Sequence, residues 1–164
     1  MRRVLTTMEL RSDALGDGRF GAPRGRRRHI GLDLLADPGA HVFAPESGTV
    51  RLGYPYSDSR EYRIVDVFSE SGVRWRLFYV RPVVEGGARV GAGDVLGVAQ
   101  DIAARYTHPG GPVMRNHVHV QAGVSGRVLL GRHGLPVSET PWIDPGLLFR
   151  LAGIGVLGLA GGDE

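Results

Sequence analysis

Glycine and proline interrupt this chain at short intervals, and their spacing limits what it can fold into. The 164 residues include 26 glycines and 10 prolines, and the apolar runs between them are short. Because both residues weaken helix interiors and favour turns, this pattern predicts many short strands instead of long helices. A chain of this length suffices for one hydrophobic core. We therefore expect a mostly β, single compact domain of antiparallel sheets with long loops.

Several segments carry the residues that are typical of strands and turns. Residues 62–68 and 73–80 are rich in β-branched and aromatic side chains and are separated by a turn of serine and glycine, which predicts a hairpin. Met114–Ala122 is expected to form a later strand. One helical turn is expected at 102–105, and a helix after the Asp144-Pro145-Gly146 turn. Further short strands are expected at 30–35, 41–45 and 49–53 and within the glycine-broken segment 83–99.

The composition excludes several kinds of site. There is no cysteine, so disulfides and thiolate zinc sites are excluded. All 20 basic residues are arginine, which excludes Schiff-base and phosphate-loop lysines. Gly16–Gly21 matches the dinucleotide-binding fingerprint in letters, but no helix-opening sequence follows it, so no nucleotide cofactor is expected. The net charge of +3 is compatible with an anionic polymer such as cell wall but does not require one.

The basic run Arg24–Arg28 fits a solvated loop, a nucleic-acid contact or a cell-wall contact. No aromatic residues interleave this run and no DNA-binding motif accompanies it. We therefore do not expect nucleic acid as a partner.

Neither end of the chain predicts a membrane segment. The first residues begin like a signal peptide, but Thr6, Thr7 and Glu9 interrupt the apolar region that such a peptide needs. The apolar run Leu151–Ala160 is far shorter than the roughly 20 residues that a membrane span needs. We expect no membrane span and no signal peptide, in a protein made in the cytoplasm.

Two stretches far apart in the sequence offer ligands for a divalent metal. His117 and His119 are two residues apart, so in a strand both side chains project to the same face. His29 and Asp33 add an imidazole and a carboxylate. Two imidazoles and one carboxylate suit zinc with a fourth position left open for water. Six histidines also fall into such pairs by chance, so spacing alone leaves both interpretations open.

Longer stretches around these residues share a pattern that is more specific than the pairs. They are, in chain order, Gly21–Gly25 leading into His29–Asp33, then Val42–Val50, Val90–Gly97 and His117–Gln121. Together they resemble the lysostaphin/LytM-type zinc metalloendopeptidases. The resemblance implies a duplicated hybrid-motif-like β fold and one zinc ion.

The resemblance also implies roles for particular residues. His29, Asp33 and His119 are the implied zinc ligands. His117 is the implied general base, which takes a proton from the attacking water. The implied substrates are the peptide cross-links of bacterial peptidoglycan.

The resemblance covers about residues 18–122, and it predicts three parts of the chain. We expect an N-terminal extension at 1–17, a zinc metallopeptidase-like domain at 18–146 and an apolar, glycine-rich tail at 147–164. The apolar character of this tail predicts packing against a partner subunit.

One stretch, Phe78-Tyr79-Val80-Arg81-Pro82, departs from the family's Tyr-x-His pattern. Arg81 stands where the second catalytic histidine is expected. Arginine stays protonated and cannot act as a general base, although it would stabilise an oxyanion if it pointed inward. If Arg81 faces solvent, the site lacks its second catalytic group. His108 is a second candidate for the missing role, whereas His41 and His133 are expected to be structural or surface residues.

This departure resembles the vertebrate leukocyte chemotaxin branch, which keeps the zinc site and is regarded as non-proteolytic. Similar sequences also look like small unsecreted phage and prophage proteins, which reach the wall within a particle or after lysis. Two functions follow as alternatives. One is a zinc-dependent endopeptidase that acts on peptidoglycan. The other is a catalytically inactive zinc-binding structural or cell-wall-binding module, such as a virion or tail component.

Overall fold

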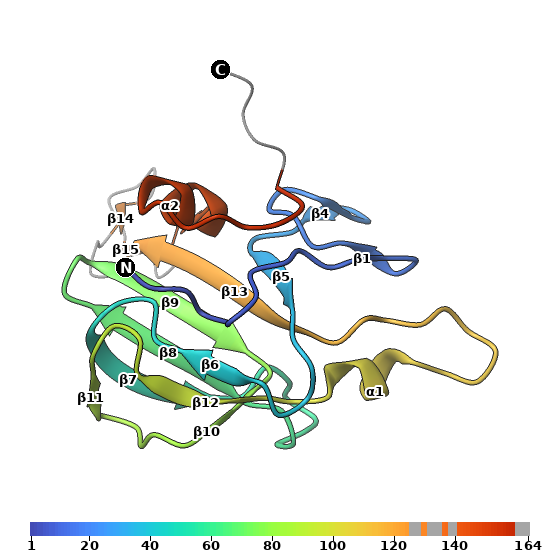
Figure 1. Ribbon diagram of the computed structural model, residues 1–164, viewed down its shortest axis with the longest axis horizontal. Coiled ribbons are helices and arrows are strands. Elements are labelled where there is room, and N and C mark those ends of the chain that lie inside the picture. The colour runs from blue at the N-terminus through green and yellow to red at the C-terminus, as the bar shows by residue number, and fades with distance from the viewer. Residues whose placement is uncertain (125–128, 131–135, 138–140, 160–164) are drawn as a thin grey trace.

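The computed structural model describes residues 1–124, 129–130, 136–137 and 141–159, and it is mostly β, as the glycine spacing predicted (Figure 1). The strands are β1 (Ser12–Asp13), β2 (Gly16–Asp17), β3 (Pro23–Arg24), β4 (Arg27–Arg28), β5 (Leu32–Leu35), β6 (His41–Phe43), β7 (Gly48–Gly53), β8 (Ile64–Ser69), β9 (Val73–Phe78), β10 (Val80–Pro82), β11 (Arg89–Val90), β12 (Val95–Ala99), β13 (His117–Val124), β14 (Leu129–Leu130), β15 (Pro136–Val137) and β16 (Trp142–Ile143). The helices are α1 (Ile102–Tyr106) and α2 (Pro145–Leu151).

The largest sheet is antiparallel and has the strand order β11-β7-β8-β9-β13-β16, with β5 pairing on β13 as well. Strands β8 and β9 form the predicted hairpin, in which Val67 lies opposite Trp75. Gly72 in its turn has a φ of 82°, which glycine adopts without strain. Strand β13 lies between β9 on one side and β5 and β16 on the other. The strand that carries the two neighbouring histidines is therefore central to the sheet.

The period-two alternation of side chains gives this sheet one apolar and one polar face. Val65, Leu77 and Val120 are opposed across β8, β9 and β13, and all three are fully buried. Their chain neighbours Asp66 and Arg76 lie on the other face, where they form an ion pair at 2.7 Å. The candidate histidines of β13 belong to this polar face.

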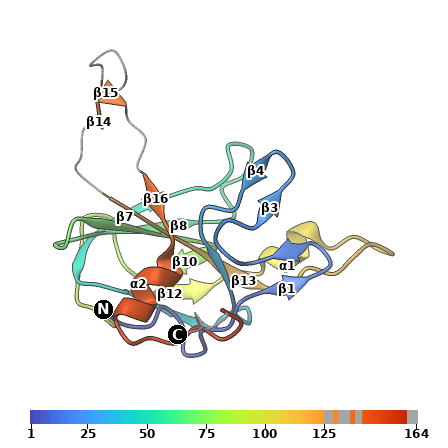
Figure 2. The ribbon, with the colours of Figure 1, turned by 90° about the horizontal axis from the view of Figure 1, so that it is seen from above.

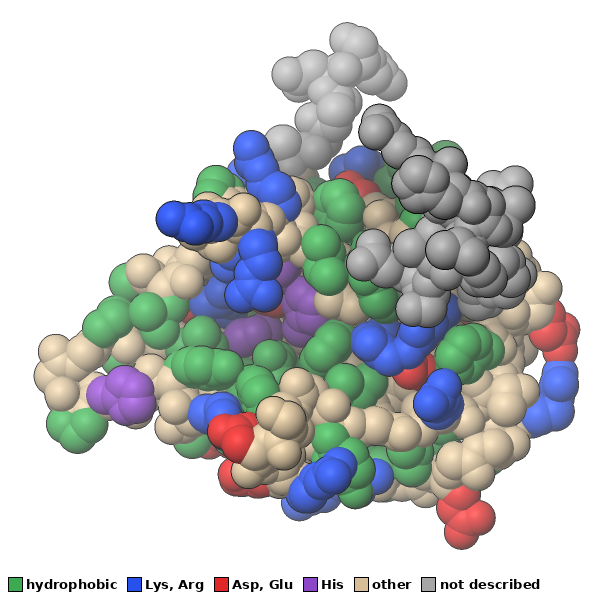
Figure 3. Space-filling view, turned by 180° about the vertical axis from the view of Figure 1, so that it is seen from behind, with side chains coloured by type: hydrophobic (Ala, Val, Ile, Leu, Met, Phe, Trp, Pro, Cys, Tyr) green, Lys and Arg blue, Asp and Glu red, His purple; other side chains and the backbone are tan. Residues whose placement is uncertain are grey.

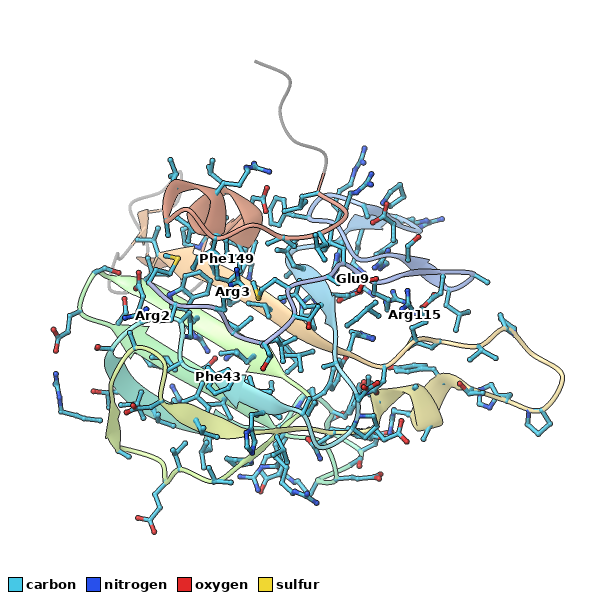
Figure 4. The ribbon with its side chains drawn as sticks, in the orientation of Figure 1. Arg2, Arg3, Glu9, Phe43, Arg115 and Phe149 are labelled. Carbon is cyan, nitrogen blue, oxygen red and sulfur yellow. The ribbon has the colours of Figure 1, made fainter. Side chains whose placement is uncertain are left out.

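The core is closed by the three-stranded sheet β10-β12-β6 and by α2 (Figure 2). Val42, Leu96 and Val80 of the small sheet are fully buried in the same cluster as the main sheet. Phe149 of α2 stacks on Trp75, with ring centroids 5.4 Å apart. Figure 4 shows Phe149 on the side of α2 that faces the main sheet.

Both predicted helical segments are confirmed. Helix α1 covers the expected turn, and the side chain of Asp101 caps it by accepting from the Ala104 N–H. Helix α2 follows the predicted turn, with Asp144 as its N-cap and Pro145 in its first turn. Among the described residues, no helix is long and apolar enough to cross a membrane.

The segments that flank the expected central domain share its core. Val4 and Met8 near the N-terminus are buried, as are Ile154 and Val156 after α2. The boundaries of the three expected parts stay predictions, as does packing of the tail against a partner subunit. His133 lies outside the described residues.

Candidate metal centre

Strands β5 and β13 place three candidate residues side by side. The strands pair with His119 opposite Asp33 and His117 opposite Leu35. Directly opposed residues of an antiparallel pair lie on the same face, so Asp33 and His119 meet. His117 shares this face with His119, as their spacing predicted.

His29 joins this group from the loop between β4 and β5. Its backbone N–H donates to the Ala22 carbonyl oxygen at 2.9 Å, which fixes the approach of the loop. The chain then passes tightly against β13 at Gly31. A Cβ at this position would overlap the Val120 carbonyl oxygen and would lie 2.7 Å from His119 Cε1. Only glycine therefore lets the loop deliver His29 to the strand pair.

The three implied ligand atoms converge. His119 Nδ1 lies 2.8 Å from Asp33 Oδ1, and His29 Nε2 lies 3.1 Å from the same oxygen. The two imidazole nitrogens are 3.0 Å apart, and all three atoms lie within 4.8 Å of one another. His117 stands beside them, with its Nε2 3.8 Å from Asp33 Oδ1.

Hydrogen bonds on the outer nitrogens orient these imidazoles. His29 Nδ1 donates to the Arg19 carbonyl oxygen at 2.8 Å, which leaves the lone pair of Nε2 toward Asp33. His119 Nε2 lies 3.0 Å from the side-chain amide of Gln121. Outer contacts of this kind fix the ring orientation of metal-binding histidines. The donor set, two imidazole nitrogens and one carboxylate oxygen, therefore fits a zinc ion.

Two arginines hold the second oxygen of Asp33. Arg11 donates to Oδ2 from Nη2 at 3.1 Å and from Nε at 3.3 Å, and Arg24 Nη2 donates to it at 3.2 Å. Arg11 is only 2% exposed and also donates to both oxygens of Asp13 at 2.8 Å. These contacts turn Oδ1 toward the histidines. Neither Arg11 nor Asp13 was predicted, because no motif marks them in the sequence.

The N-terminal segment also positions the loop that precedes β13. Asp13 Oδ2 accepts from the Arg115 backbone N–H at 2.9 Å, and the Arg115 carbonyl oxygen accepts from His117 Nδ1 at 3.0 Å. Glu9 and the Arg115 guanidinium face each other at 3.9 Å across the surface (Figure 4). Because its Nδ1 donates, His117 keeps the lone pair of Nε2 on the side of Asp33.

Burial and charge set the protonation states of the group. Burial alone would raise the pKa of Asp33, but its contacts with His119 and His29 bring this pKa well below its ordinary value. Burial lowers the pKa of His117 and of His119, against the opposing effect of the Asp33 carboxylate. At neutral pH the carboxylate is therefore ionised and these two imidazoles are neutral. Metal ligands and a general base need these states.

The group lines an open pocket of about 800 Å³. Figure 3 shows histidine side chains near the middle of this face, with arginines beside them and apolar side chains around them. A pocket of this size accommodates a short segment of peptide. The apolar lining residues are Leu15, Ile30, Phe78 and Met114.

Curated relatives share this sequence over two thirds of its length, although no family model matches it. Leukocyte cell-derived chemotaxin-2 of Mus musculus is 30% identical over 111 residues, which are 66% of this chain and 69% of that protein. Myeloid protein 1 of Gallus gallus is 32% identical over 122 residues, which are 70% of this chain and 35% of that protein.

Solved structures identify the fold. The solution structure of lysostaphin matches with a TM-score of 0.61 and 23% identity, over 92% of this chain and 54% of that chain. The structure of LytU matches with a TM-score of 0.57 and 18% identity, over 85% and 84% of the two chains. The chain belongs to the lysostaphin/LytM-type peptidase family. It spans about half the length of the lysostaphin chain that it matches, and the expected lysostaphin/LytM-like fold is confirmed.

Arg81, which stands in the sequence where the family has its second catalytic histidine, does not face the candidate metal centre. Arg81 lies exposed on β10, opposite Val98 of β12, and lines a separate pocket beside Gln100. Arg81 does not line the pocket that contains His29, Asp33 and His119. Tyr79 lines this pocket instead. In a regular strand Tyr79 and Arg81 would share one face. Tyr79 has a φ of 64°, and this left-handed backbone breaks the alternation between β9 and β10.

Tyr79 is a functional candidate that sequence reasoning missed. Its hydroxyl oxygen accepts from the Tyr56 hydroxyl at 3.4 Å, and Tyr56 lies 2.9 Å from the hydroxyl of Tyr106. Burial raises the pKa of Tyr79 to about 12, so the phenol stays protonated at neutral pH. Its ring stands edge-on to His117, with centroids 5.7 Å apart. Because its oxygen accepts from Tyr56, the hydrogen of Tyr79 is left to donate.

The remaining candidate histidines lie away from this centre. His108 is exposed in the loop after α1 and does not line the pocket of the ligand set. The structure therefore does not bring it to the position of the missing histidine. His41 is exposed on β6, as expected of a surface residue.

Proposed function

We propose that this protein is a zinc-dependent endopeptidase that acts on peptide cross-links of bacterial peptidoglycan. The observation that carries this proposal is the convergence of His29, Asp33 and His119 beside a fourth side chain, His117, in an open pocket. The lysostaphin-like fold supports the same reaction class.

The donor set would hold one zinc through His29 Nε2, Asp33 Oδ1 and His119 Nδ1. When bound, zinc supplies Lewis acidity, which lowers the pKa of water and polarises a carbonyl group. The carboxylate is turned toward this position by Arg11 and Arg24, and the His29 imidazole by its hydrogen bond to the Arg19 carbonyl oxygen.

His117 acts as the proton carrier of the reaction. Its Nδ1 donates to a backbone carbonyl, so Nε2 accepts a proton from the attacking water and passes it to the leaving amine. Its lowered pKa keeps it neutral, as a base must be before the attack.

Tyr79 supplies the second catalytic group in the place of the family's histidine. A negative charge develops on the scissile carbonyl oxygen during the attack, and a preorganised O–H donor stabilises it. Tyr79 lines the pocket next to His117 and has its hydrogen free for this contact.

The alternative is a zinc-binding module on the same fold that recognises cell wall without cutting it. Among the described residues that line the pocket, the histidines are His29, His117 and His119, so none takes the place of the family's second catalytic histidine. This favours the alternative. So does the relation to the chemotaxin branch. Incorporation into a phage particle, or release by lysis, stays a proposal for how either form would reach the wall.

The deciding experiment treats purified peptidoglycan with the zinc-loaded protein and measures the release of free amino groups. His117→Ala is the control, compared at equal zinc content. Release that depends on zinc and on His117 supports the peptidase. Binding to peptidoglycan without release supports the module, whereas neither binding nor release would overturn both proposals.

A further inference from the structure

We propose that the pocket selects acidic peptides, and that Arg27 and Arg28 of the β3–β4 hairpin bind a substrate carboxylate next to the metal centre. This inference rests on the proposed function, because it names the substrate class of the same site. The Arg24–Arg28 run then has a specific role instead of forming only a solvated loop.

The lining of the pocket has an excess of positive charge. Its four arginines are Arg11, Arg24, Arg27 and Arg28. Among the described residues that line it, the one carboxylate is Asp33. This carboxylate is fully engaged, with Oδ1 on the histidines and Oδ2 on two of the arginines.

The four arginines fall into two classes. Arg11 is neutralised by Asp13 and Asp33, and Arg24 by Asp33. Arg27 and Arg28 have no ion pair with any carboxylate in the described part of the chain. Both are exposed, and Arg28 makes a hydrogen bond to the Gly21 carbonyl oxygen at 3.1 Å. These two guanidinium groups are therefore the ones available to an anionic ligand.

The hairpin fixes these groups close to the ligand set. Arg27 pairs with Arg24 across the hairpin, and Arg28 pairs with Pro23. Arg24 Nη2 donates to the Asp17 carbonyl oxygen at 2.7 Å and to Asp33 at 3.2 Å, which ties the hairpin to the metal centre. Arg27 and Arg28 line the same pocket as His29, Asp33 and His119, so a ligand in this pocket can contact both groups.

The remainder of the pocket favours a peptide over a more highly charged polymer. Leu15, Ile30 and Met114 line it with aliphatic surface, and Ile30 is 41% exposed. Guanidinium groups bind carboxylates through paired, charge-assisted hydrogen bonds. The occupant that fits is a short peptide with one carboxylate and apolar neighbours, because a polyanion would leave the aliphatic surface without a partner.

The test measures binding to the zinc-loaded protein by fluorescence, with two dansylated tripeptide amides, Ala-Glu-Ala and Ala-Gln-Ala. These differ by one carboxylate. We expect the glutamate peptide to bind about tenfold more tightly at low salt, as one or two charge-assisted hydrogen bonds provide. The difference should shrink as salt increases, since the two arginines are exposed.

The variant Arg27→Gln/Arg28→Gln should abolish this preference, and Arg26→Gln is its matched control. Arg26 is exposed on the same hairpin but does not line the pocket. Equal zinc content and equal melting temperatures of the variants would show that the loss does not come from unfolding. Equal affinity for the two peptides, or a preference that survives in the double variant, would overturn the inference. So would displacement of the glutamate peptide by a single-stranded oligonucleotide at lower concentration.

The peptide-binding test and the peptidoglycan assay can fail independently of each other. A protein that releases amino groups but does not distinguish the two peptides keeps the proposed function and loses this inference. A protein that prefers the glutamate peptide but releases no amino groups keeps this inference as the specificity of a binding module.

Discussion

The two sides of the pocket are built in different ways. On one side, antiparallel pairing of β5 with β13 sets Asp33 opposite His119, and several hydrogen bonds hold each side chain. On the other side, the residue that faces the pocket is set by the left-handed backbone of Tyr79, whose φ is 64°. Paired strands place Asp33 and His119, whereas one backbone angle determines which residue faces them across the pocket. We therefore expect the ligand side to tolerate little change and the Tyr79 side to change activity without changing zinc binding.

The largest effect is expected from His119→Ala. The variant loses one of three ligands, and we expect the zinc affinity to fall by more than about 100-fold, since loss even of outer partners costs 10–100-fold. Competition with a chromogenic chelator measures this affinity. His41→Ala, an exposed histidine on β6, is the control and should bind zinc normally. An unchanged affinity in His119→Ala would exclude the proposed ligand set.

A second change tests the ligand side through its backbone. In Gly31→Ala the new methyl group overlaps the Val120 carbonyl oxygen and His119. We expect a loss of about 2 kcal/mol in the free energy of unfolding, as for other overpacked sites, together with weaker zinc binding. Denaturant unfolding measures the first quantity. Gly155→Ala is the matched control, because no atom lies within 4 Å of its added Cβ, and equal stability of the two variants would contradict the close packing.

Much of the fold around His29, Asp33 and His119 could be predicted from the sequence. The β8–β9 hairpin, α2 and the shared face of His117 and His119 followed from local patterns, because strand alternation and turn chemistry are local. The convergence of His29 with Asp33 and His119 came from the family resemblance. The pairing of β5 with β13 is long-range, and residue spacing alone does not encode it.

The other side of the pocket could not be predicted in the same way. A left-handed tyrosine leaves no mark in the sequence, so the sequence did not decide whether Arg81 points into the pocket or faces solvent. The contribution of Arg11 was missed for another reason. It is a buried arginine in the N-terminal segment, and its contact with Asp33 depends on how that segment folds back over β5.

A third change addresses the Tyr79 side. We expect Tyr79→Phe to lower kcat on peptidoglycan about 100-fold, as loss of one oxyanion donor does, while zinc content and KM stay the same. Kinetics of amino-group release separates the two parameters. If KM rises and kcat does not change, Tyr79 binds substrate and does not act in the transition state.

The smallest effect is expected from Arg81→Gln and His108→Ala. Both side chains are exposed and line no part of the pocket, so activity and zinc content should not change, and the free energy of unfolding should stay within about 0.5 kcal/mol of the parent protein. The same release assay and unfolding titration measure this. A large loss of activity in Arg81→Gln with normal stability would return the second catalytic role to that residue.

X-ray absorption at the zinc edge tests the assignment of the ligands most directly. We expect one zinc per chain, bound by two imidazole nitrogens and one carboxylate oxygen, with one exchangeable light atom in the fourth position. A first shell with three imidazoles would make His117 a ligand instead of a base. A phenolate in that shell would make Tyr79 a ligand, and either result, or no zinc at neutral pH, would contradict the division of the pocket into a ligand side and a catalytic side.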